Sequence, residues 1–126
     1  MNDWTTDELD SIGRAEELDL ASQRDNGSLR SFVTMWVARF GDDLYVRAAY
    51  GPTSAWFRRA LASGTGRIRA GGLERDVSFD HIAETAEHAA IDAAYHEKYD
   101  RYGPKIVNTV VGETAKTVTI RLVPRS

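Results

Sequence analysis

The stretch from Trp36 to Gly72 constrains the fold more than any other part of the chain, because turn and helix signals follow one another closely within it. The Gly41-Asp42-Asp43 turn separates two β-rich runs, residues 36–40 and 44–50, and predicts an antiparallel hairpin. Gly51-Pro52 ends the second run, since proline cannot donate to a strand ladder and glycine permits a sharp change of direction. The sequence therefore predicts a strand, a turn, a second strand and a break in quick succession.

A short helix is predicted to begin at Thr53 or Ser54, whose hydroxyl can accept from a free backbone N–H group. The first turn of a helix presents unpaired donors and a positive partial charge, which suit an anion. Arg47 precedes this helix, and Arg58 and Arg59 lie within it. The sequence thus predicts an anion site at the start of the helix.

The remaining elements follow from similar local signals. A Thr5 to Glu8 capping box starts an N-terminal helix, while Asn26-Gly27 and Gly71-Gly72 each predict a hairpin turn. The predicted helices span about residues 7–15, 54–63 and 82–101, with a further turn from 104; the predicted strands are 18–23, 29–40, 44–50, 66–70, 73–79 and 116–123. Six strands in hairpins predict an α+β fold whose mainly antiparallel sheet curls into a small barrel, with two to three flanking helices.

The predicted strand from Leu29 to Phe40 carries apolar residues at both alternating sets of positions. A strand that is apolar on both faces is central in a sheet, or is shared between a barrel core and a contact between subunits. Symmetric dimers are the commonest assemblies of small domains. We therefore expect a homodimer.

Composition excludes several classes of function. The 126 residues suit a single domain, 1–126, and the formal charge of −3 gives no basic field for nucleic acid. The chain has no cysteine, so disulfides and thiolate metal sites are excluded. It also has no apolar run of signal or membrane length, which predicts a cytoplasmic protein without a membrane partner.

Several runs resemble the bacterial DUF2255 family: LRSFVTMWVARFGDDLYVRAAYGPTSAWFRRALASGTGRIRAGG, then AIDAAYHEKYDRYG and TVTIRLVPR. That family is similar to split β-barrel flavin-binding proteins, which include pyridoxamine-phosphate-oxidase-like proteins and deazaflavin-dependent nitroreductases. The resemblance implies a six-stranded split barrel that dimerises, with FMN or deazaflavin (F420) bound at the subunit interface. It also implies an oxidoreductase that acts on a small molecule.

Carried over residue by residue, the resemblance implies a set of cofactor-binding positions. Thr34 and Trp36 fall on the strand beside the flavin ring. The phosphate contacts fall on Arg47, Ser54, Trp56 and Arg58 or Arg59. Oxidase-like members often have a lysine where this chain has Trp56, so FMN, deazaflavin, another phosphorylated ligand and no cofactor all stay open.

Each of these positions also has a structural interpretation. Arg47 interrupts an apolar strand, so its guanidinium needs an anionic partner, either a ligand phosphate or a carboxylate such as Asp43 or Glu74. The two helix arginines also fit a solvated face, and Trp36 and Trp56 also fit the core. If indoles fill the pocket, the alternative function is a non-enzymatic module for small ligands or for interaction on the same barrel.

Four polar residues recur every four positions in the helix predicted over 82–101: Glu84, His88, Asp92 and His96. We expect this face to be exposed, since a stripe of Ile91 and tyrosines provides the apolar face, and we predict no metal site there. No serine lies in a GxSxG elbow, and the sequence identifies no catalytic residue.

Overall fold

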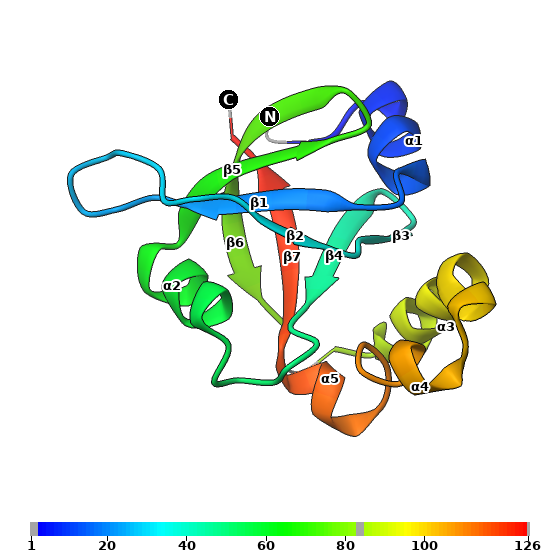
Figure 1. Cartoon of the computed structure of the whole chain (residues 1–126). Coiled ribbons are helices and arrows are strands. Elements are labelled where there is room, and N and C mark those ends of the chain that lie inside the picture. Colours follow the sequence, from blue (N-terminus) through cyan, green and yellow to red (C-terminus); the bar gives the residue numbers. More distant parts are fainter. Residues whose placement is uncertain (1–2, 83–84, 126) are drawn as a thin grey trace.

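The computed structural model describes residues 3–82 and 85–125, and its centre is one antiparallel sheet that curls into a barrel (Figure 1). Seven strands follow one another across the sheet in the order β2-β1-β5-β6-β7-β4-β3. The strands are β1 (Leu18–Ser22), β2 (Val33–Met35), β3 (Ala38–Phe40), β4 (Asp43–Arg47), β5 (Thr65–Ala70), β6 (Leu73–His81) and β7 (Thr119–Pro124). The helices are α1 (Thr6–Arg14), α2 (Ala55–Ser63), α3 (His88–Tyr99), η1 (Asp100–Tyr102), α4 (Pro104–Val107) and α5 (Glu113–Thr117). The predicted α+β class is confirmed.

The expected long strand over residues 29–40 is wrong. The chain bends after Met35, so this segment forms two short strands, β2 and β3, which lie at opposite edges of the sheet. Only two residues, Trp36 and Val37, join the two edges, and this link closes the barrel. Val33 keeps 38% exposure, because β2 has a neighbour on one side only. The split also explains why the sheet has seven strands and not six.

Local signals predicted several other elements well. Thr5 caps α1 and exchanges hydrogen bonds with Glu8 as a capping box, and Gly64 ends α2 in the left-handed conformation. The Gly71-Gly72 hairpin joins β5 to β6 as predicted. By contrast, α3 begins at His88 and not at 82, and the short helix α5 lies where the last strand was expected to begin.

Two apolar clusters hold the fold together. The larger one fills the barrel and includes Leu18, Val46, Phe57, Ile68 and Ile120. The smaller one packs Tyr45 and Ala38, from the outer side of β4 and β3, against α3 and the segment that follows it. Figure 1 shows α3, α4 and α5 gathered on one side of the barrel, and we call residues 88–117 the helical cap. The candidate site lies between the helical cap and the barrel.

None of the helices in the described ranges, 3–82 and 85–125, is both long enough and apolar enough to cross a membrane.

Candidate functional site

A cleft of about 740 Å³ opens between the barrel and the helical cap. One wall comes from β2 and the link after it, a second from the start of α2, and a third from α4 and the segment after it. Its lining residues are Glu17, Val33, Thr34, Met35, Trp36, Arg47, Ala49, Tyr50, Ser54, Ala55, Trp56, Arg59, Ile106, Thr109 and Val110. Six of the seven predicted site residues lie around this cleft, and only Arg58 does not.

The start of α2 is the most polar part of the cleft. Ser54 occupies the N-cap position, yet its side chain makes no capping hydrogen bond. Its Oγ atom is buried and has no hydrogen-bond partner among the described residues. The first amides of a helix also lack intrahelical acceptors, and the first turn of α2 contains no acidic residue. A buried hydroxyl and free N–H groups therefore point to an acceptor, such as an anion, that the protein itself does not supply.

Two exposed charged side chains line the cleft. Arg59 of α2 and Glu17, just before β1, both line it, and neither side chain forms a hydrogen bond or an ion pair among the described residues. The hydroxyl of Thr34 donates to Asp19 at 2.6 Å, so this residue is already engaged with the neighbouring strand. Among the described residues that line the cleft, Arg59 thus offers a free cation near the start of α2.

Trp36 lines the cleft and belongs to a group of aromatic rings. Trp36 stacks on Tyr99 of α3, with ring centroids 4.0 Å apart and planes 6° from parallel, and Tyr102 lies beside both rings. The Tyr99 hydroxyl donates to the Glu16 carbonyl at 2.7 Å and accepts from the Val37 amide at 3.2 Å. Burial raises the pKa of Tyr99 to about 12, so the hydroxyl stays protonated at neutral pH. Trp36 therefore has a rigid backing and can present an ordered aromatic edge to a ligand.

Arg47 is the predicted site residue whose surroundings differ most from expectation. Its side chain is fully buried and pairs with Asp92 of α3, not with Asp43 or Glu74. It also donates to Thr119 Oγ1 and to the Val110 carbonyl, both at 2.9 Å, so the guanidinium is held by partners within the protein. The carboxylate interpretation of Arg47 is thus the one that the contacts support. Sequence reasoning missed Asp92, because it assigned that residue to an exposed face.

The polar face of the helix predicted over 82–101 is in part buried. His88 is only 6% exposed and lies 3.1 Å from an Arg47 nitrogen, and His96 pairs with Asp100. Glu84 lies outside the described residues. Within the described part of the chain, no group of three or more histidine, aspartate or glutamate side chains could hold a metal ion.

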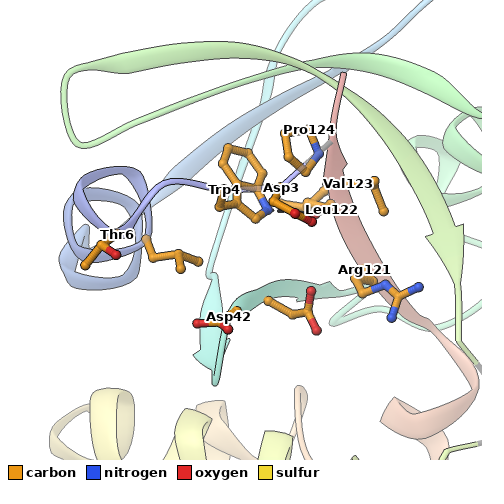
Figure 2. Close-up of a pocket in the computed structure, with 10 residues that line it drawn as sticks. Asp3, Trp4, Thr6, Asp42, Arg121, Leu122, Val123 and Pro124 are labelled. Atoms are coloured by element: carbon orange, nitrogen blue, oxygen red, sulfur yellow. Dashed lines mark hydrogen bonds between the residues drawn. The ribbon is translucent and has the colours of Figure 1, made fainter. Parts of the chain in front are cut away.

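A second cavity, of about 580 Å³, lies at the end of the barrel that Trp4 covers (Figure 2). Figure 2 shows Trp4 beside the last strand, with Arg121 and Asp42 further round the opening. The Trp4 indole donates to the Leu122 carbonyl at 3.0 Å, and nearby Asp42 and Glu87 add to burial in raising the pKa of Asp43. The polar groups here are satisfied or face solvent, unlike Ser54 in the larger cleft. The larger cleft is therefore the candidate site.

Solved structures of other proteins share this fold at low sequence identity. HutZ, a haem storage protein from Vibrio cholerae, has a TM-score of 0.66 and 13% identity over 93% of this chain and 87% of its own. A putative pyridoxamine 5′-phosphate oxidase from Listeria innocua has a TM-score of 0.62 and 17% identity over 94% of this chain and 90% of its own. An F420-H2-dependent reductase has a TM-score of 0.61 and 15% identity over 86% of this chain and 93% of its own. The chain therefore has the split-barrel fold of these proteins.

None of the curated proteins is significantly similar to this chain in sequence. Residues 8–122 match the model of a family described as uncharacterized proteins conserved in bacteria, DUF2255. The chain belongs to the DUF2255 family, which confirms the resemblance seen in its sequence.

Proposed function

We propose that the cleft binds a phosphorylated flavin-type cofactor, FMN or a deazaflavin, with its phosphate at the start of α2. The buried and unpartnered Oγ atom of Ser54 carries this proposal. A buried hydroxyl without a partner costs free energy, which an anionic ligand would recover by accepting from it. The free amides of α2 and the exposed guanidinium of Arg59 favour the same ligand charge.

The rest of the cleft suits a planar ring system. Trp36, backed by Tyr99, and Trp56 supply aromatic surface, while Met35 and Ile106 supply aliphatic surface. Such a lining binds the ring, orients it and excludes water from it. A bound flavin would supply the hydride or electron chemistry, and the chain would then act as an oxidoreductase on a small molecule.

Haem is a less suitable ligand for this cleft, although one protein of the same fold stores it. Histidine is the common protein ligand of haem iron, and none of the residues that line the described cleft is a histidine. A non-enzymatic module that binds another small phosphorylated ligand is the remaining alternative, and the same experiment distinguishes it from a flavoprotein.

The test is titration of the purified protein with FMN, FAD and a deazaflavin, followed by visible absorbance and flavin fluorescence. We expect saturable binding of at least one flavin. Replacement of Ser54 by alanine should weaken the free energy of flavin binding by about 1.5 kcal/mol, the value of a hydrogen bond to a charged group. Thr53→Ala is the matched control, since Thr53 is exposed and does not line the cleft. The flavin proposal fails if the parent protein binds no flavin, and binding of inorganic phosphate alone would favour the non-enzymatic alternative.

The proposed cofactor-binding protein is a homodimer. Val33, Tyr50 and Ile106 are exposed apolar residues gathered around the cleft, where a second copy would cover them and enclose the ligand. Light scattering over a range of concentrations should give twice the chain mass of 14.0 kDa. Tyr50→Asp should shift this mass toward the monomer. A monomer at high concentration would contradict the proposal.

A further inference from the structure

Arg47 contacts three parts of the chain that lie far from it in sequence. From β4 it reaches His88 and Asp92 of α3, the Val110 carbonyl after α4, and the Thr119 hydroxyl at the start of β7. Its side chain has no exposed surface, and its contacts with Thr119, Val110 and His88 are buried, while Asp92 keeps 23% of its side chain exposed. A single guanidinium is suited to such a junction, because its donors point in several fixed directions.

Asp92 extends the junction to the next residues of the cap. One of its carboxylate oxygens pairs with Arg47, and the other accepts from the Gly112 amide at 3.3 Å. The backbone of residues 110–112 is therefore held at two points, by Arg47 at the Val110 carbonyl and by Asp92 at the Gly112 amide. We call residues 106–112 the cap wall.

The cap wall forms one side of the candidate cleft. Ile106, Thr109 and Val110 line the cleft, opposite the barrel residues of β2 and the start of α2. Val110 lines the cleft and also supplies the carbonyl that Arg47 holds. The cap wall includes the end of α4 and is followed by α5; these helices are only four and five residues long, and neither has a side-chain cap. Helices of this length do not hold their position without outside contacts.

We infer that Arg47, together with Asp92, is a positioning residue that fixes the cap wall against the barrel and so sets the width of the cleft. Because its guanidinium is engaged by these partners, Arg47 leaves ligand contact to Ser54, Arg59 and the aromatic residues. Its effect on ligand affinity rests on the proposed function, whereas its effect on the cap wall does not.

The first measurement is hydrogen exchange of the ligand-free protein, which needs no assumption about the ligand. Arg47→Lys keeps the charge but removes the branched donor geometry, and Asp92→Asn is a milder variant that retains the shape of the carboxylate. We expect amides 106–112 to exchange about tenfold faster or more in both variants, a larger change than that of the amides in β5 and β6. Arg121→Lys is the matched control: this arginine pairs with Asp80 at 2.6 Å, is not among the residues that line the cleft, and should leave the cap wall unchanged.

The second measurement is the dissociation constant for FMN, or for the flavin that the parent binds best. Arg47→Lys and Asp92→Asn should raise it about tenfold, with Arg121→Lys equal to the parent. Unchanged exchange at 106–112 would overturn the inference, as would a loss of protection spread equally over the barrel strands. A parent protein that binds no flavin would refute the proposed function, while the exchange data would still decide the role of Arg47.

Discussion

Replacement of Gly66 by alanine should destabilise the protein by roughly 3 kcal/mol, at the upper end of the cost of overpacking a core. Gly66 lies in β5, is buried, and pairs with Ser22 on one side and Val77 on the other. A methyl group added there would overlap the Ala21 carbonyl oxygen and lie 2.8 Å from the Phe79 ring. The first of these atoms belongs to the backbone of the neighbouring strand, so it can move only if the strand moves.

Urea denaturation of the variant checks this value, and Gly72→Ala is the matched control. Gly72 has a positive φ of 81° in the β5–β6 turn, but nothing lies within 4 Å of an added methyl group. Its replacement should therefore cost only about 1 kcal/mol, from backbone strain. Gly66 is not among the glycines with a positive φ, so equal losses in the two variants would contradict the close approach of β1 to β5 as the reason for glycine at position 66.

The second large effect is expected for Arg47→Met, which should cost about 3 kcal/mol of unfolding free energy. The variant leaves the Asp92 carboxylate, whose side chain is only 23% exposed, without its cationic partner. It also leaves the Val110 carbonyl and the Thr119 hydroxyl without their donor. A double variant, Arg47→Met with Asp92→Leu, should recover most of the loss, since it removes both charges together.

Chemical denaturation of the parent, both single variants and the double variant gives the coupling free energy of the pair. Arg121→Met provides the comparison with a pair at the surface: Arg121 and Asp80 are 37% and 46% exposed, so their separation should cost between about 0 and 1 kcal/mol. If the double variant is as unstable as Arg47→Met, the loss comes from packing of the long side chain and not from the unpaired charge.

Features set by a few neighbouring residues were predictable from the sequence. The capping box of α1, the glycine that ends α2 and the Gly71-Gly72 turn each depend on local hydrogen bonds or backbone conformation. The position of Ser54 at the start of α2 follows from the same kind of signal. Most of the predicted site residues lie together because these local elements frame one cleft.

Features that depend on contacts between distant segments were not predictable in this way. Residues 29–40 look like one strand by alternation, but barrel closure bends the chain at Trp36 and sends its two halves to opposite edges. In α3, His88 and Asp92 share a face with Ile91 and Tyr95, since residues three and four apart lie on the same side of a helix. Arg47, a charged residue in the otherwise apolar strand β4, was the signal that could have identified Asp92 as a buried partner.

The short link between β2 and β3 also bears on how the protein avoids aggregation. Each of these edge strands is only three residues long, and together they form both borders of the sheet. A border of this length offers few free N–H and C=O groups to a strand from another molecule. Because Trp36 and Val37 join the borders directly, neither strand can lengthen at the link without opening the barrel. The same bend that closes the fold therefore protects it from polymerising edge to edge.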